Sequence, residues 1–238
     1  MSEAPQEAVT GILHPGTMGV TVGAACSGTV LWASEGRSDA TRQRAADAGL
    51  VDVGDLASMV ATADMVISVC PPHGAEALAD TVADAGFAGC YVDANAVSPT
   101  TARKIGALFE DFVDGSLIGP PAKEPGTTRL YLSGSHAEGV AARFEGSALE
   151  PRVLQGGETG AASALKMAYA SWTKGTSALL MSVAALAAAG LPDGFHRAAS
   201  EVFERLGVFK EARGASVERL IAALLGSPAT RADGDEQV

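Results

Sequence analysis

The sequence predicts an α/β protein in two parts, a doubly wound parallel sheet over residues 1–157 and a smaller all-helical domain over residues 158–238. In the first part, short apolar β-type runs alternate with helix-type segments. This alternation is typical of βαβ units, whose strands form a parallel sheet with helices on both faces. From about Thr159 the chain is rich in Ala, Leu, Ser and Met and has no proline before Gly190, which predicts one long helix.

Five strands are expected in the first part, with a further pair after them. The five are short β-type runs at 8–13, 29–34, 64–70, 89–96 and 111–118. The further pair is expected at 128–134 and 152–157, with a helix at 136–146 between them. The long helix covers 159–190, two more helices fit 194–206 and 210–225, and residues 227–238 have the polar composition of a frayed tail.

The composition favours a globular chain that binds a small molecule. Hydrophobic residues make up 47% of the 238 residues and charged residues 19%, which is enough apolar material for a large core. The net charge of −11 argues against a nucleic-acid partner, because phosphate binding needs clustered Lys and Arg. We therefore expect a small-molecule substrate and no nucleic acid.

The cysteines and the apolar segments indicate a cytoplasmic protein. Cys26, Cys70 and Cys90 are an odd number, lie far apart in apolar segments and show no metal-ligand spacing, so reduced thiols and no metal site are expected. The N-terminus has acidic residues and no apolar signal region, and the longest apolar stretch is too short for a bilayer. No membrane association is expected.

The stretch GILHPGTMG, residues 11–19, has the position of a dinucleotide-binding turn between the first strand and a helix. Gly16 and Gly19 stand at the second and third glycine positions of the Rossmann-type fingerprint, and His14 replaces the first. Pro15 is expected to hold His14 in an extended conformation. The candidate cofactor-binding residues of this turn are His14, Pro15, Gly16, Thr17, Met18 and Gly19. The alternative is a glycine-containing loop in an α/β fold that binds no nucleotide.

Residues near the end of the second strand are expected to select the cofactor, because they reach the adenosine ribose. Glu35 offers a carboxylate for the ribose hydroxyls of NAD. Ser34, Arg37 and Ser38 offer hydroxyl groups and a positive charge for the 2′-phosphate of NADP. We expect NADP rather than NAD; the alternative is that Arg37 is an ordinary solvated charge.

Further motifs follow in an order that resembles one enzyme superfamily. VISVCPP, YVDANAVSP, FVDGSLIGPP and GAASALKMAYASW occur after the turn in that order. Over residues 8–225 the chain resembles the β-hydroxyacid dehydrogenase and 6-phosphogluconate dehydrogenase superfamily, in its branch with a short phosphogluconate-dehydrogenase-like C-terminal domain of unknown function. The resemblance implies a Rossmann domain that binds NAD(P), a helical domain that closes the active site, and a dimer.

The resemblance also implies roles for single residues. Cys70 and Pro71 would lie beside the adenosine ribose and the pyrophosphate, and Asn95 near the nicotinamide ribose. The substrate-binding motif of the family, a Ser followed by two Gly, falls at 118–120, where only Gly119 matches; Ser116 lies two residues earlier. Ser116 and Gly119 are therefore candidate substrate-binding residues.

Lys166 in the long helix matches the catalytic lysine of the family. Where the phosphogluconate enzymes continue with His and Asn, this chain has Tyr169 and Ala170, which argues against a sugar-phosphate substrate. Helical spacing places Lys166, Tyr169, Thr173 and Ser177 on one polar stripe, so Tyr169 is a second candidate proton donor and Thr173 a candidate substrate-binding residue. The alternative is that Lys166 extends to the surface from a packing helix.

Together these features predict an NADP-dependent oxidoreductase that transfers a hydride to or from a small carbonyl, imine or hydroxyacid, with Lys166 as acid/base. Two alternatives stay open: a non-catalytic dinucleotide sensor or scaffold, and an imine reductase that uses Tyr169. Because the helical region after residue 158 is short, a homodimer with the long helix at the interface is expected. Asp93 and Asp114, at strand ends, are expected to be structural; the alternative is that they orient the site.

Overall fold

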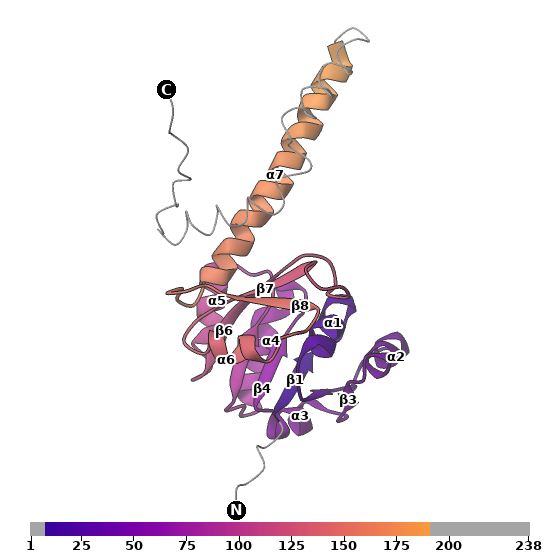
Figure 1. Cartoon of the computed structure of the whole chain (residues 1–238), viewed down its shortest axis with the longest axis vertical. Helices are drawn as coiled ribbons and strands as arrows, with labels where there is room; N and C mark the ends of the chain where they lie inside the picture. Colours follow the sequence, from indigo (N-terminus) through magenta and orange to yellow (C-terminus); the bar gives the residue numbers. More distant parts are fainter. Residues whose placement is uncertain (1–7, 191–238) are drawn as a thin grey trace, which may run out of the picture. The chain divides into compact units, whose positions relative to one another are not determined.

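The computed structural model describes residues 8–190, with side chains as far as Leu179 (Figure 1). The chain divides into two compact units between Lys166 and Met167. The first unit holds the whole sheet and the beginning of the long helix α7, which runs from Ala161 to Gly190. The predicted helices at 194–206 and 210–225 and the predicted tail lie outside the described residues.

The first unit is built on an eight-stranded sheet in the order β3-β2-β1-β4-β5-β6-β7-β8. Neighbouring strands from β3 to β6 are all parallel. The strands are β1 (Val9–Leu13), β2 (Thr29–Trp32), β3 (Val51–Asp52), β4 (Met65–Ser68), β5 (Cys90–Asp93), β6 (Phe112–Ile118), β7 (Thr128–Ser133) and β8 (Leu149–Val153). The first six strands thus have the 3-2-1-4-5-6 order of the dinucleotide-binding fold, which confirms the predicted doubly wound sheet.

The last two strands depart from the parallel pattern. β7 pairs antiparallel with β6, and β8 pairs parallel with β7. β8 covers Leu149–Val153 and not the predicted 152–157, because the expected run ends in the Gly156 and Gly157 turn. Pro151 inside β8 hid the strand in the sequence, yet a proline is tolerated here because β8 is an edge strand.

The helices cover the two faces of the sheet, as expected for crossover connections (Figure 1). They are α1 (Thr17–Ala25), α2 (Asp39–Asp47), α3 (Leu56–Thr62), α4 (Ala75–Asp84), α5 (Pro99–Gly106) and α6 (Ala137–Ala142). Alternate strand residues point to opposite faces, so Ile12 and Ile67 belong to the core with α1, α2 and α6, whereas Leu13 and Val66 belong to the core with α3, α4 and α5.

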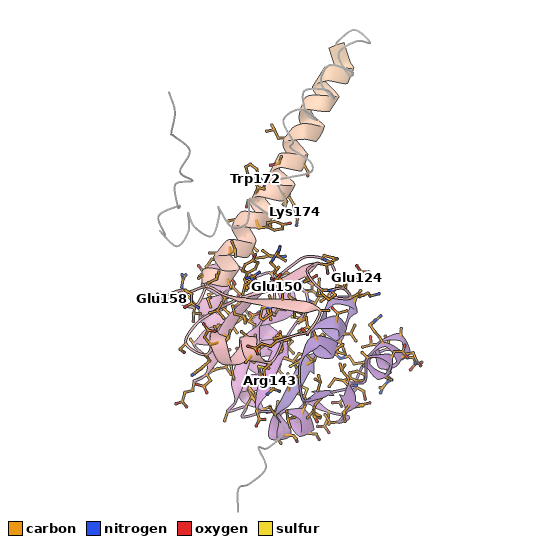
Figure 2. All side chains as sticks on the ribbon, viewed as in Figure 1. Glu124, Arg143, Glu150, Glu158, Trp172 and Lys174 are labelled. Atoms are coloured by element: carbon orange, nitrogen blue, oxygen red, sulfur yellow. The ribbon has the colours of Figure 1, made fainter. Side chains whose placement is uncertain are left out.

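Arg143, which follows α6, connects the helix between β7 and β8 to the start of β1 (Figure 2). Its Nη2 donates hydrogen bonds to the Oγ1 of Thr10 at 2.7 Å and to the carbonyl of Ala8 at 3.1 Å. The backbone N–H of Ser27 in turn donates to the Arg143 carbonyl at 2.8 Å. These contacts hold α6 against the start of β1 and the end of α1.

Two further expectations concern the cysteines and the membrane. Cys26, Cys70 and Cys90 are all free thiols, as the sequence predicted. Within residues 8–190, no helix combines the length and the apolar character that crossing a membrane would require.

Candidate dinucleotide site

The turn after β1 is made by His14 in the left-handed conformation. Its φ is 62°, and it is the single non-glycine residue with positive φ in the described part of the chain. The expectation of an extended His14 is therefore wrong: the residue adopts the backbone conformation for which glycine is usually chosen. The N–H of Gly16 donates to the His14 carbonyl at 2.7 Å, which closes the turn. The turn is thus tight although the first glycine is absent.

The two surviving glycines serve different purposes. A Cβ at Gly19 would overlap the carbonyl oxygen of His14, so only glycine lets α1 pack this closely against the turn. A Cβ at Gly16 would meet nothing nearer than that same oxygen at 3.9 Å, so the space in front of Gly16 is open. Glycine at this second position leaves room for a ligand to approach the backbone, as the dinucleotide fingerprint requires.

α1 presents an uncapped N-terminus at this turn. Gly16 is the N-cap residue, and no side chain caps the helix end. The first-turn N–H groups of Thr17, Met18 and Gly19 therefore have no helical acceptor, and the helix dipole adds partial positive charge there. The Nη1 of Arg44, from α2, donates to the Pro15 carbonyl at 3.3 Å and holds the loop in place. Such a helix end suits a phosphate group.

A cavity of about 360 Å³ opens at this helix end. It lies beyond the carboxyl ends of β1, β2 and β4, where the strand order reverses and where ligands bind in doubly wound sheets. Its walls are His14, Gly16, Thr17, Met18, Gly19, Arg37, Thr41, Val69, Cys70 and Pro71. The structure thus brings together most of the predicted cofactor-binding residues. Loop residues from three strands, far apart in sequence, form one pocket.

Four predicted cofactor residues do not line this cavity. Pro15 and Ser34 are buried. Ser38 caps α2, because its Oγ accepts from the N–H of Thr41 at 3.3 Å. Asn95 is 3% exposed. The side chains of these residues are therefore engaged in or enclosed by the fold around the cavity.

Asn95 joins the ends of two neighbouring strands. Its Oδ1 accepts from the N–H of Cys70 at 2.6 Å, and its Nδ2 donates to the Oγ of Ser68 at 2.9 Å. Its own N–H donates to the Oδ1 of Asp93 at 2.9 Å. These bonds set the path of the Cys70 loop that forms one wall of the cavity. Sequence reasoning did not identify this bridge, because the partners lie 25 and 27 residues away.

Two titratable groups in this region have shifted pKa values. Burial raises the pKa of Asp93 to about 6, and the nearby Asp114 charge acts in the same direction. Burial, together with the negative charge of Asp93, also raises the pKa of the Cys70 thiol. Cys70 is thus a neutral thiol in the cavity wall and not an activated nucleophile.

Lys166 points to β6 from the first turns of α7. Its Nζ donates a hydrogen bond of 2.6 Å to the carbonyl of Leu117. This contact lies within the first compact unit, one residue from Ser116 along the strand. The lysine amine is therefore held at the C-terminal half of β6 and does not extend freely to the surface.

Asp114 anchors the beginning of α7. Its Oδ2 accepts from the N–H groups of Gly160 and Ser163, both at 3.0 Å, and its Oδ1 accepts from the Ser163 hydroxyl at 2.6 Å. The Ser133 hydroxyl donates to Oδ2 at 3.1 Å and accepts from the N–H of Ala162 at 3.1 Å. A buried carboxylate at a helix N-terminus is stabilised by the helix dipole. Asp114 is structural, as the sequence predicted.

The two substrate-binding candidates, Ser116 in β6 and Gly119 directly after it, differ in their surroundings. Ser116 is 1% exposed, and its Oγ has no hydrogen-bond partner among the described residues. Gly119 has φ 138°, and a Cβ there would overlap the carbonyl of Thr127. The close approach of the two chain segments therefore explains why Gly119 is a glycine. Its part in substrate binding stays a prediction, as does that of Ser116.

The polar stripe on α7 is largely satisfied inside the helix. The hydroxyl of Thr173 donates to the Tyr169 carbonyl at 2.9 Å, and that of Ser177 donates to the Thr173 carbonyl at 2.9 Å. Such bonds to the preceding turn are a common way for Ser and Thr to sit in apolar helices. Tyr169 is half-buried, whereas Trp172 and Lys174 are exposed (Figure 2). The roles of Tyr169 and Thr173 stay predictions.

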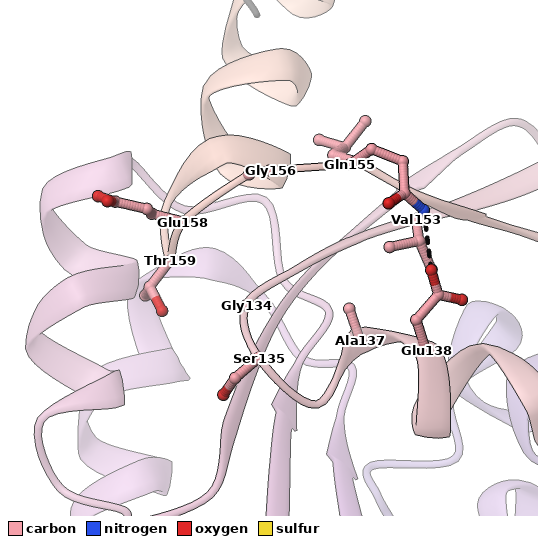
Figure 3. Close-up of a pocket in the computed structure, with 11 residues that line it drawn as sticks. Gly134, Ser135, Ala137, Glu138, Val153, Gln155, Gly156, Glu158 and Thr159 are labelled. Atoms are coloured by element: carbon pink, nitrogen blue, oxygen red, sulfur yellow. Dashed lines mark hydrogen bonds between the residues drawn. The ribbon is translucent and has the colours of Figure 1, made fainter.

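A second cavity, of about 460 Å³, lies away from the predicted site residues, beside the carboxyl ends of β7 and β8 (Figure 3). The Nε2 of Gln155 donates to the Oε1 of Glu138 at 2.8 Å across its wall. None of the predicted site residues lines it. The cavity next to α1 is therefore the candidate dinucleotide site.

Comparison with known proteins places the chain among proteins of this fold. No protein-family model matches it. An uncharacterized 28.5 kDa protein of Methanothermus fervidus, from the 7S RNA 5′ region, is 32% identical over 155 residues. The match covers 64% of this chain but only 59% of that curated relative, so the chain spans less than two thirds of the relative's length.

Solved structures extend the comparison over nearly the whole chain. A conserved protein of unknown function, described as similar to 3-hydroxyacid dehydrogenases, is 29% identical with a TM-score of 0.67, over 92% of this chain and 81% of that one. An imine reductase variant of Myxococcus stipitatus in complex with NAD⁺ is 22% identical with a TM-score of 0.62, over 95% and 81%. The 3-hydroxyisobutyrate dehydrogenase of Mycobacterium tuberculosis, with L-serine, is 18% identical with a TM-score of 0.63, over 86% and 71%. The structure neighbours are thus 3-hydroxyacid dehydrogenase-like proteins and imine reductases, and this chain shares their fold, which agrees with the superfamily resemblance seen in its motifs.

Proposed function

We propose that this chain is an NADP-dependent oxidoreductase that transfers a hydride to or from a small carbonyl, imine or hydroxyacid. The observation that carries the proposal is the cavity at the switch point of the sheet, which combines an uncapped helix N-terminus with the positive charge of Arg37. The fold neighbours, among them an imine reductase solved with NAD⁺ and a reductive aminase solved with NADPH, support a nicotinamide dinucleotide.

Arg37 supports NADP as the cofactor. It lines the cavity, whereas Glu35, the carboxylate that would suit NAD, is exposed and does not line it. The 2′-phosphate of NADP needs a cation at the end of the second strand, and Arg37 follows β2 at that place. Gly16 and the first-turn amides of α1 would hold the pyrophosphate.

Lys166 is the proposed acid/base. Reduction of a carbonyl leaves negative charge on its oxygen, and a neighbouring ammonium stabilises that charge and donates the proton. When bound, the nicotinamide supplies the hydride. The Leu117 carbonyl orients the Lys166 amine through their 2.6 Å hydrogen bond, so that a proton can be passed from a fixed position. Ser116, beside Leu117 with an unpaired buried hydroxyl, is the proposed substrate-binding partner.

Cofactor binding is the first test. Purified protein should quench NADPH fluorescence with micromolar affinity, and Arg37→Ala should weaken NADPH binding at least tenfold while changing NADH binding little, because only NADPH carries the 2′-phosphate. Arg42→Ala is the matched control, since Arg42 lies on α2 but outside the cavity. Failure to bind either dinucleotide would refute the proposal.

Turnover is the second test. With a panel of small ketones, imines and hydroxyacids, Lys166→Ala should lower kcat by about 10²–10⁴ and leave NADPH affinity within twofold. Lys174→Ala, an exposed lysine farther along α7, should have no effect. A wild-type protein that binds NADPH and converts none of these substrates would favour the second candidate, a non-catalytic dinucleotide sensor or scaffold.

Imine reduction with Tyr169 as proton donor is a further candidate, favoured by the imine reductases among the fold neighbours. In that case Tyr169→Phe should lower the rate with imines more than Lys166→Ala does.

We also propose that the chain acts as a homodimer through its long helix. Light scattering after size-exclusion chromatography would contradict this if it gave a 24.0 kDa species.

A further inference from the structure

The turn holds His14 in a strained conformation, although the turn itself does not require a histidine. A left-handed conformation is unfavourable for residues with a side chain, and glycine adopts φ 62° without a steric penalty. Strained residues of this kind persist where the strain serves a ligand site. The fold would be served equally well by glycine at this position, so the imidazole needs another explanation.

Hydrogen bonding within the protein does not supply that explanation. The Nδ1 of His14 is shielded from solvent and has no hydrogen-bond partner among the described residues. An unpaired polar atom of this kind disfavours the folded state. The imidazole is therefore not retained for a bond that stabilises the turn.

The position of the imidazole relative to charged groups points to an anion. His14 lines the dinucleotide cavity together with Arg37 from the β2–α2 loop and Cys70 from the loop after β4. Arg37 is positive, Cys70 is a neutral thiol, α1 adds its positive end, and Arg44 binds the adjacent Pro15 carbonyl. Among the residues that the structure describes, no carboxylate lines the cavity. Every charge that faces the imidazole from these elements is positive.

We propose that His14 binds a phosphate group of the dinucleotide together with Arg37, and that it takes up one proton from solvent as the phosphate enters. This inference rests on the proposed function and assigns a new role within the same site. In the protein alone, burial and then the Arg37 charge lower the pKa of His14, which keeps the imidazole neutral near pH 7. A bound phosphate supplies the missing negative charge and favours the imidazolium.

Proton-coupled binding has a defined pH dependence. Between the lowered pKa of His14 in the free protein and its higher pKa in the complex, each unit of pH increase should raise Kd by up to tenfold. Calorimetry at pH 7 in buffers of different ionisation enthalpy should show net uptake of up to one proton by wild type. Uptake with both NADP⁺ and NAD⁺ would identify the pyrophosphate as the partner, and uptake with NADP⁺ alone the 2′-phosphate.

His14→Gly separates this role from a structural one. Glycine suits φ 62°, so this variant should melt at the same temperature as wild type or higher, yet lose the proton uptake and the pH dependence of Kd. His14→Asn, which also tolerates the left-handed region but does not titrate, should behave likewise. Proton uptake by His14→Gly equal to that of wild type would refute the inference, since any titration of the 2′-phosphate is common to both proteins.

A second measurement distinguishes this inference from the proposed function. In NMR titrations with inorganic pyrophosphate, the imidazole signal that is absent from His14→Gly should show an increase in pKa with ligand. If neither dinucleotide binds but pyrophosphate raises this pKa, the oxidoreductase proposal fails and the phosphate role of His14 stands. If the dinucleotides bind and neither they nor pyrophosphate change the His14 titration, the phosphate role of His14 fails and the oxidoreductase proposal stands.

Discussion

Replacement of Asp114 is the sharpest test of how the first compact unit holds the start of α7. Asp114→Ala removes a buried acceptor from the hydroxyls of Ser133 and Ser163 and from the N–H groups of Gly160 and Ser163. A hydrogen bond to a charged group contributes about 1.5–3 kcal/mol. Burial of the carboxylate offsets part of this sum, as the raised pKa of Asp114 indicates. We therefore expect a loss of about 3–5 kcal/mol, the range for breaking a buried charged network.

Urea unfolding at constant pH measures this loss through the midpoint and slope of the transition. Asp111→Ala is the matched control, because the Asp111 side chain is 45% exposed and its ion-pair partner, His136 at 3.3 Å, is exposed as well, so a change of about 0.5 kcal/mol or less is expected. Asp114→Asn keeps the shape and one acceptor oxygen and should fall between the two. A loss below about 1 kcal/mol for Asp114→Ala would refute the view that this network stabilises the fold.

Two other substitutions test the site and its surroundings. Asp93→Asn should stabilise the protein above pH 6. The folded-state pKa of Asp93, about 6, exceeds the usual value of 3.8, so wild-type stability should fall by about 3 kcal/mol as pH rises through this window. Asn should remove this contribution to the slope in urea titrations from about pH 4 to 8. Unchanged slopes would contradict it. Gly19→Ala should displace α1 from the His14 carbonyl and weaken dinucleotide binding at least tenfold by fluorescence, and full affinity would show that the close packing is dispensable.

The sequence indicated the elements of the sheet well because each strand is a local pattern. The apolar runs near β1, β4, β5 and β6 lie between turn residues, and α7 follows the predicted long helix through the described residues, from Ala161 to Gly190. The two edge strands of the sheet, β3 and β8, were not predicted correctly from the sequence. β3 has only two residues, both exposed, and β8 contains Pro151, so neither shows the buried run by which strands are recognised.

The candidate site was only partly accessible from sequence, because side-chain partners far apart along the chain are not visible in a local pattern. Gly16 and Gly19 are recognisable by spacing, and Arg37 by its distance from them. The conformation of His14 was expected to be extended and is left-handed, since the close packing of α1 against the turn outweighs the local preference that Pro15 imposes.

By itself, the sequence determined the alternation of most strands and helices, the glycine-containing turn after β1 and the resemblance of its motifs to one superfamily, because these depend on spacing and on local conformational preference. Only the tertiary structure decided that His14 and Arg37 share one cavity, that Asn95 joins two strand ends, and that Asp114 and Leu117 hold α7 and Lys166. These relations depend on contacts between segments that the chain brings together only when the sheet has formed.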